Sequence, residues 1–193
     1  TATGDQRWSW DSLLPAFVRM EDHSNPDGLV RGRGGPLPVM VPDEDLYSPL
    51  VRSYMAAWEG LGVPRIADHN GGEMVGTTPN SLTIRGGLRV TVADGYLNPV
   101  THRPNLTVID SAIVHRLVIT GDRVSSVTYE KDGAIHSLDA ATVVLAAGAV
   151  GTPALLMRSG IGPRKILDAA GVPVLVESPG VGRNLHDLSL IHI

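Results

Sequence analysis

The chain of 193 residues contains no cysteine, no apolar run long enough to span a membrane and no block of like charges. Without cysteine it has neither a disulfide framework nor a thiolate site. A transmembrane helix needs about 20 mostly apolar residues, so we expect no membrane span. A net charge of −4, with both signs interspersed, offers no basic surface for nucleic acid. The sequence does not fix the compartment, and we slightly favour the cytoplasm.

Aromatic residues are also scarce, at 4%, whereas 22 glycines and 14 prolines are typical of a chain with many turns. The hydrophobic content of 42% is sufficient for a sizeable core in one domain or slightly more. A mean hydropathy of +0.07 is typical of a folded, enzyme-like protein rather than a disordered chain.

Besides the stretch 142–162, which is treated below, four segments are predicted to be helical, because apolar residues recur at intervals of three and four or because a capping residue opens them. They are 9–20, 43–61, 91–97 and 163–170. Ser9 or Asp11 can cap the first helix, and Thr91 forms a capping box with Asp94 at the third.

Short strands are predicted where β-branched and apolar residues alternate between glycine and aspartate turns. Four in succession form a meander, and two others lie outside it; the six are 105–109, 112–120, 124–130, 134–138, 37–41 and 172–177. Segments 21–36 and 68–72 are rich in glycine, proline and asparagine, which predicts loops, and 178–182 predicts a glycine turn.

The stretch Thr142–Gly162 has the sequence TVVLAAGAVGTPALLMRSGIG. Residues 143–147 predict a buried strand and Gly148 a sharp turn. Thr152 and Pro153 predict the N-cap and the first position of a helix. A strand, a glycine turn and a helix N-terminus in succession can bind a nucleotide. The same pattern also fits an ordinary buried strand–turn–helix, so at this point both interpretations stay open.

Several phrases, in order along the chain, together resemble the glucose–methanol–choline (GMC) oxidoreductases, a family of FAD-dependent enzymes. The segment GTPALLMRSGIG at 151–162 resembles the second signature of that family. The other phrases are WSWD (8–11), LPAF (14–17), GGPLPV (34–39), DHNG (68–71), YLNP (96–99), RPNLTV (103–108), VVLAAGA (143–149) and PGVGRNLHD (179–187). The resemblance therefore spans residues 8–187.

The resemblance implies a mixed α/β fold, in which a partial, Rossmann-like FAD-binding domain with a β-meander is interleaved with part of a substrate-binding domain. It assigns residues 1–88 to the lid and part of the substrate-binding domain, and 89–187 to the second part of the FAD-binding domain. Residues 188–193, LSLIHI, do not continue the family pattern, so we expect a non-native tail.

The resemblance also implies which residues contact FAD. The backbone of Val114 would contact the adenine end of the cofactor, and Ala146, Ala147 and Gly148 would lie beside the same part. A turn of small residues lets backbone N–H and C=O groups approach an adenine edge without a side chain in the way.

The activity that the resemblance implies is oxidation of a small-molecule alcohol, with hydride transfer from the CH–OH carbon to N5 of the flavin and a histidine as base. No glycines here have the spacing and strand–helix context of G-x-G-x-x-G, and the sequence stops before the region of the catalytic histidine pair. We therefore assign no catalytic residue. We expect an internal fragment of a longer enzyme, which by itself is inactive and holds FAD poorly.

Two other classes of protein share parts of this pattern. A non-catalytic Rossmann-like module would bind ADP or another nucleotide, and a disulfide-reductase relative is disfavoured because there is no cysteine pair. The seven histidines lack the spacing of metal ligands, so no metal site is expected. Ser159 lacks the G-x-S-x-G context of a nucleophile and is predicted to end a helix. The substrate and the oligomeric state cannot be predicted.

Overall fold

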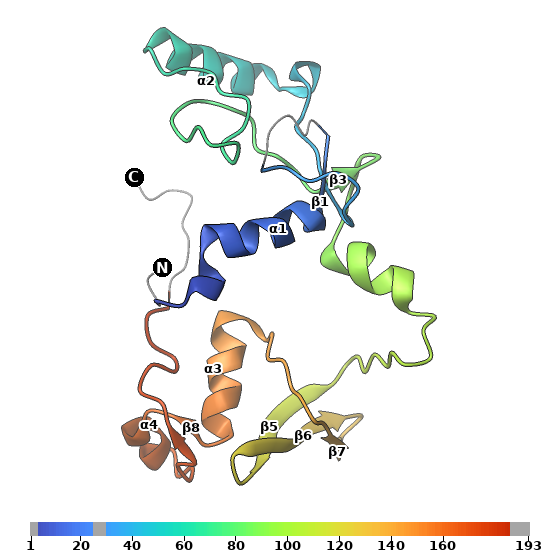
Figure 1. The fold of residues 1–193 in the computed structure, drawn as a ribbon, viewed down its shortest axis with the longest axis vertical. Helices are drawn as coiled ribbons and strands as arrows, with labels where there is room; N and C mark the ends of the chain where they lie inside the picture. The colour runs from blue at the N-terminus through green and yellow to red at the C-terminus, as the bar shows by residue number, and fades with distance from the viewer. Residues whose placement is uncertain (1–3, 25–29, 186–193) are drawn as a thin grey trace. The chain divides into compact units, whose positions relative to one another are not determined.

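The computed structural model describes residues 4–24 and 30–185. The chain divides into two compact units, Thr1–Thr107 and Val108–Ile193, which are treated separately below (Figure 1). The division predicted between residues 88 and 89 concerns the domains of the family and stays a prediction. The predicted tail, 188–193, lies outside the described residues.

Unit 1 begins with a short 3-10 turn, η1 (Gln6–Trp8), and the helix α1 (Trp10–Met20). Ser9 caps α1, because its hydroxyl accepts a hydrogen bond of 3.3 Å from the backbone N–H of Ser12. This confirms the first predicted helix and selects Ser9 from its two candidate caps.

The second predicted helix begins later than expected. A separate 3-10 turn, η2 (Glu44–Leu46), precedes the helix α2 (Pro49–Gly60). Ser48 caps α2 by accepting a hydrogen bond from Val51, and Pro49 occupies the first position. A serine cap followed by proline is a stronger start signal than apolar spacing, which does not distinguish a helix from a turn leading into it.

The prediction that 21–36 is entirely loop is wrong, because β1 (Glu21–His23) pairs in parallel with β2 (Leu37–Val39). The strand β1 is polar and short, so no apolar alternation marks it. The backbone at Gly32 lies so close to the end of α1 that only glycine fits, since a Cβ on Gly32 would lie 1.8 Å from the carbonyl oxygen of Val18.

The capping box is confirmed. The carboxylate of Asp94 accepts hydrogen bonds from the N–H (2.8 Å) and the hydroxyl (2.6 Å) of Thr91, and the Thr91 hydroxyl accepts from the N–H of Asp94 (3.2 Å). These bonds hold the pKa of Asp94 below its usual value. They open a π-helical turn, η3 (Ala93–Leu97), which continues into η4 (Asn98–Val100). Before it lies a small hairpin of β3 (Ile84–Arg85) and β4 (Leu88–Arg89).

Unit 2 contains the predicted meander. Its strands β5 (Ile113–Thr120), β6 (Arg123–Lys131) and β7 (Ala134–Asp139) are antiparallel and lie in sequence order. Residues 105–109 form no strand, contrary to prediction. No strand in the described part of the chain pairs with them, and a strand exists only where a neighbour supplies its hydrogen bonds.

The helix α3 (Gly148–Arg158) packs on β5, as Figure 1 shows. Leu117 of β5 and Leu155 of α3 are 6% and 5% exposed. Ser159 joins the two elements, because its hydroxyl donates to the carbonyl of Leu155 (2.7 Å) and accepts from the N–H of Leu117 (2.9 Å). Ser159 is thus a helix-end residue, as predicted.

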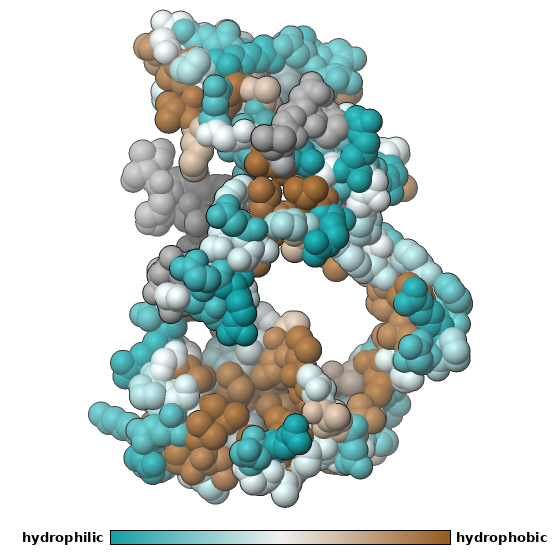
Figure 2. Space-filling model, viewed as in Figure 1, coloured by the Kyte–Doolittle hydropathy of each residue, from teal (hydrophilic) through white to brown (hydrophobic). Residues whose placement is uncertain are grey.

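After α3, unit 2 contains one short helix and two short strands. The helix α4 (Arg164–Ala169) confirms the predicted helix at 163–170, and its Leu167 is 1% exposed. The strand β8 (Ile161–Gly162) pairs in parallel with β9 (Val176–Glu177), so the strand predicted over 172–177 is limited to its last two residues. Figure 2 shows apolar atoms gathered on part of the surface of this unit.

Candidate functional site

The segment that leads into α3 is not the buried strand that its apolar residues predict. Residues 143–147 pair with no strand among the described residues, and Val144 is 85% exposed. A buried parallel strand needs hydrogen-bonded neighbours and helices over both faces, and neither is supplied here. In this run Val144, Ala146 and Ala147 are exposed and Val143 and Leu145 are half-buried, and the run ends at the glycine turn.

Gly148 makes that turn. Its φ is +78°, in the left-handed region that glycine adopts without strain. A Cβ at this position would meet no heavy atom within 4 Å, so the space beside the backbone is open. Ala146, Ala147 and Gly148 are all exposed. The structure thus brings these three predicted site residues together at the start of α3, where a ligand can approach the main chain.

Thr152 does not cap α3 in the predicted way, because the helix starts at Gly148 and Thr152 lies one turn inside it. Its hydroxyl instead accepts a hydrogen bond of 3.1 Å from the backbone N–H of Ala147. Pro153 lies inside the helix rather than at its first position. The positive φ of Gly148 allows the helix to begin earlier than a threonine–proline signal predicts.

Val114, the fourth predicted site residue, lies on β5 opposite Tyr129 and is 37% exposed. Its carbonyl accepts a hydrogen bond of 3.3 Å from Arg158, and that guanidinium also donates to the carbonyl of His115 (3.0 Å). The register of β5 shifts between Val114 and Arg116 and again between Val118 and Ile119, as in a β-bulge.

Arg158 ends α3, about 15 Å along the helix from Gly148 at 1.5 Å per residue. Val114 is therefore held by the C-terminal end of α3, whereas Ala146–Gly148 lie at its N-terminal end. No described hydrogen bond joins Val114 to these residues. The structure groups three of the four predicted residues and leaves the fourth in the neighbouring strand.

A cavity of about 320 Å³ lies beside the first turns of α3. One wall is the face of α3 that carries Pro153 and Met157, and the other is the predicted glycine turn with the residues after it, including Gly182, Arg183 and Leu185. Gly182 has a φ of +77°, and a Cβ on it would lie 3.2 Å from Cε of Met157. Arg183 is the charged residue of this lining. Sequence reasoning did not select it, although it directly follows the glycine turn.

Sequence reasoning also missed a charged cluster in unit 1. Arg31, whose side chain is 9% exposed, donates two hydrogen bonds to Asp68 (2.6 and 2.7 Å) and one of 3.1 Å to Glu21. The Arg31 guanidinium holds the pKa of Asp68 below its usual value. The cluster ties the two predicted loops, 21–36 and 68–72, to each other, and its only signal in the sequence was the charge of its three residues, of which Asp68 opens the phrase DHNG.

Two histidines have structural contacts instead of the arrangement of metal ligands. His115 lies 3.1 Å from the carboxylate of Glu130, and His136 stacks on Tyr129 with ring centroids 5.2 Å apart. Across residues 4–24 and 30–185, no group of three histidine, aspartate or glutamate side chains could hold a metal ion. Within the same ranges, every helix is too short or too polar to cross a membrane.

The sequence of this chain is similar to those of known oxidoreductases. The family model described as GMC oxidoreductase matches residues 1–189. The pyridoxine 4-oxidase of Microbacterium luteolum is 46% identical over 187 residues, 96% of this chain and 37% of that protein. The 5-(hydroxymethyl)furfural oxidase of Methylovorus sp. (strain MP688) is 37% identical over 194 residues, 100% of this chain and 36% of that protein.

A solved structure agrees with these matches. The crystal structure of pyridoxine 4-oxidase from Mesorbium loti superposes with a TM-score of 0.85 at 49% identity, and the match covers 91% of this chain and 35% of that one. The likeness confirms the predicted mixed α/β fold class with a partial Rossmann-like domain. The chain spans about a third of the length of the curated relatives that it matches.

Proposed function

Because the chain belongs to the GMC oxidoreductase family, we propose that it supplies the adenosine-side wall of an FAD site in an enzyme that oxidises CH–OH groups of a small-molecule alcohol. The names of its relatives support this class of reaction, since one oxidises pyridoxine and another 5-(hydroxymethyl)furfural. When bound, FAD supplies the acceptor, N5, for the hydride that leaves the alcohol carbon. No residue of this chain is assigned to the hydride or proton step.

The observation that carries the proposal is the open backbone at Ala146–Gly148. Adenine presents both donors and acceptors on its edge, and an unshielded main chain offers the complementary groups. The N–H of Ala147 is engaged by Thr152, so Ala146, Gly148 and the Ala147 carbonyl are the groups left to bind. The first N–H groups of α3 lack partners within the helix and carry the positive end of its dipole.

Two further residues fit the same ligand. The carbonyl of Val114 accepts one hydrogen bond from Arg158 and keeps a second lone pair for a ligand donor. Arg183, at the cavity beside α3, would place a guanidinium where the phosphates of a dinucleotide need a cation. Ala146–Gly148 and Arg183, at the N-terminal part of α3, therefore fit parts of the adenosine diphosphate half of FAD, whereas Val114 lies at the other end of the helix.

ADP is the probe that tests this assignment without redox chemistry. Titration calorimetry should show ADP binding to the chain, weakened about tenfold or more by Gly148→Val, since a side chain would occupy the open space beside the backbone. Gly133→Val is the matched control, because Gly133 also has a positive φ (+76°) and open surroundings but lies in the β6–β7 turn. Equal ADP affinity of the two variants would refute the proposed site.

Flavin colour distinguishes the oxidoreductase from the non-catalytic alternative. An enzyme that contains this chain should carry flavin absorbance that bleaches when an alcohol is added without oxygen. A colourless protein that still binds ADP would instead be a nucleotide-binding module.

A further inference from the structure

Asn70, in the loop 68–72 of unit 1, is the only asparagine of the sequence that precedes a glycine. The other asparagines precede proline, leucine or serine. The side-chain amide of an asparagine can be attacked by the backbone nitrogen of the next residue, and a side chain on that residue hinders the approach. Glycine has no Cβ and rotates freely, so it hinders the attack least. Asn70–Gly71 is therefore the pair of this chain most open to such a reaction.

The structure leaves this pair accessible. Asn70 and Gly71 are both exposed. The three heavy atoms nearest to a Cβ on Gly71 would all belong to Asp68, at 3.3–3.5 Å, and a Cβ on Gly72 would meet no heavy atom within 4 Å. The loop around the amide is thus free of packing against distant segments at both glycines.

Two hydrogen bonds to Asp68 restrain the loop. The carboxylate of Asp68 accepts from the N–H of Asn70 (2.9 Å), and its carbonyl accepts from the N–H of Gly71 (3.1 Å). The second bond must open before the Gly71 nitrogen can react, because this nitrogen has to lose its proton. The fold therefore slows the reaction without blocking it.

Asn105 offers an internal comparison with the same backbone bond. The N–H of Leu106, which follows it, donates to the carbonyl of Arg103 at 3.1 Å, as Gly71 does to Asp68. Asn105 is also exposed. The two sites therefore differ chiefly in the residue after the asparagine.

The charged cluster of unit 1 lies beside this loop. Arg31 and Asn70 line the same cavity, of about 310 Å³. The guanidinium of Arg31 already faces two carboxylates, those of Asp68 and Glu21. A carboxylate in place of the Asn70 amide would add a third negative charge around one cation, and nearby like charges disfavour one another.

We propose that Asn70 is a site of spontaneous deamidation, which adds a carboxylate beside the Arg31 cluster and loosens it. The Gly71 nitrogen loses its proton and attacks Cγ of Asn70, so that a new N–C bond closes a succinimide ring. The Cγ–Nδ2 bond breaks and ammonia leaves. Water then opens the ring at either carbonyl, which gives aspartate or isoaspartate without any oxidation or reduction. The proposal does not depend on FAD.

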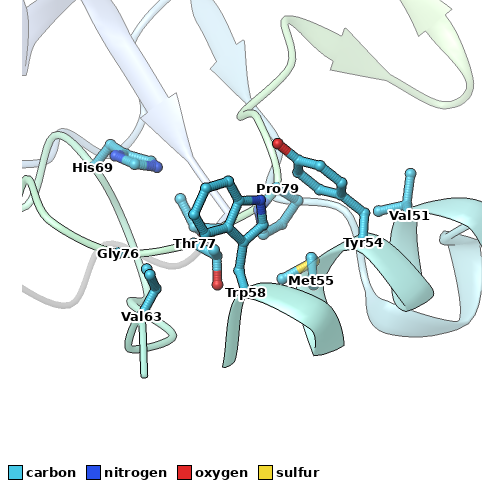
Figure 3. Close-up of a pocket in the computed structure, with 10 residues that line it drawn as sticks. Val51, Tyr54, Met55, Trp58, Val63, His69, Gly76, Thr77 and Pro79 are labelled. Carbon is cyan, nitrogen blue, oxygen red and sulfur yellow. The ribbon is translucent and has the colours of Figure 1, made fainter. Parts of the chain in front are cut away.

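The isoaspartate product has a second consequence, because it lengthens the backbone by one atom at Asn70. His69, the preceding residue, lines another cavity of unit 1, of about 390 Å³, beside Trp58 and Thr77 (Figure 3). Asn70 itself lines the cavity that contains Arg31. The modification would thus change the loop where it borders both cavities.

Tryptic digestion places the site and a comparison on one peptide. Cleavage after Arg65 and Arg85 gives the peptide 66–85, which contains Asn70 and Asn80. After incubation of the whole chain in mildly alkaline buffer, fragment-ion mass spectrometry should find the mass gain from amide to acid about tenfold more often at Asn70 than at Asn80. An unincubated sample, digested in parallel, gives the background. Equal modification of the two, or none in the folded chain, would overturn the proposal.

Two substitutions test the role of the following residue. Gly71→Ala should slow deamidation about tenfold. Gly60→Ala is the matched control in unit 1, because Gly60 is exposed and a Cβ there would meet no heavy atom within 4 Å. Conversely, Leu106→Gly should raise deamidation of Asn105 toward the rate of Asn70. Parent-like rates in both Gly71→Ala and Leu106→Gly would contradict the proposed reaction.

Asn70→Asp gives the charged product directly and tests its effect on the cluster. Amide exchange in β1, which Arg31 joins to the loop, should become about threefold faster. Asn80→Asp, which lines neither of the two cavities, should leave it unchanged. Equal exchange in the two variants would show that a carboxylate at Asn70 does not loosen the cluster.

Discussion

The two units of this chain are held together by different kinds of interaction. In unit 2, consecutive hairpins join β5, β6 and β7, and α3 packs on β5. The buried apolar residues of this unit among those described are Leu117, Leu155 and Leu167. In unit 1, the corresponding residues are only Met55 and Ile66, and distant segments are joined by charged groups. Unit 2 is therefore stabilised mainly by pairing of neighbouring strands and burial of apolar side chains. Unit 1 is stabilised more by ion pairs and hydrogen bonds between specific residues.

The largest effect is expected from Arg31→Ala, which leaves the carboxylates of Asp68 and Glu21, whose side chains are only 16% and 12% exposed, without their cation. The cost to unit 1 should be about 3–5 kcal/mol, measured as lost amide protection from hydrogen exchange. Arg85→Ala is the control, because its pair with Asp22 is largely exposed and should cost less than about 1 kcal/mol. Equal effects of both substitutions would show that the cluster does not hold unit 1.

A somewhat smaller effect is expected from Leu155→Ala, which opens a cavity between α3 and β5. The loss should be about 3 kcal/mol and should appear in amide protection of unit 2. Val150→Ala on the same helix is 71% exposed and should change stability by less than about 0.5 kcal/mol. If unit 1 lost protection to the same extent as unit 2, the separation of the two units would be wrong.

Ser159→Ala tests the buried polar contact between α3 and β5 in unit 2. It leaves the N–H of Leu117 buried without an acceptor, which should cost about 2 kcal/mol in urea unfolding. Ser159→Thr keeps the hydroxyl and should recover part of this stability. A neutral Ser159→Ala substitution would mean that a solvent molecule replaces the hydroxyl.

The smallest effect at neutral pH is expected from Asp68→Asn, about 1 kcal/mol, because asparagine still accepts a hydrogen bond from Arg31. Its pH dependence is more informative. The pKa of Asp68 is lowered, chiefly by its hydrogen bonds with Arg31, so its contribution is complete above the unfolded pKa of about 4 and is lost as the pH falls through the folded pKa. Unit 1 of the variant should lose less stability between pH 5 and pH 2 than the parent, and identical acid profiles would contradict this.

The same contrast explains what the sequence could predict. The last three strands of the meander, the capping box at Thr91 and the helix end at Ser159 follow from neighbouring residues, and all three are confirmed. The pairing of β1 with β2 and the bonds of Arg31 to Asp68 join segments far apart, and no periodicity in the sequence marks such pairs. The family resemblance was also predicted correctly, because its phrases keep their order along the chain.

The errors near α3 have a related cause. Apolar composition predicts a strand at 143–147, but composition cannot say whether a neighbouring strand is there to pair with it. The threonine–proline pair predicts that the helix starts at Thr152 and Pro153. In the structure α3 starts earlier, at Gly148, which has a positive φ. The roles of Val114, Ala146, Ala147 and Gly148 toward FAD stay predictions.

The hydrogen bond from Ala147 to Thr152 has a thermodynamic consequence. It closes the turn before any ligand is present, so a nucleotide that binds there does not have to restrict a loose backbone. Binding would then cost less conformational entropy, and the nucleotide would dissociate more slowly than from a flexible loop. If a nucleotide binds at this turn, the Thr152 hydroxyl would influence its residence time through the backbone of Ala147.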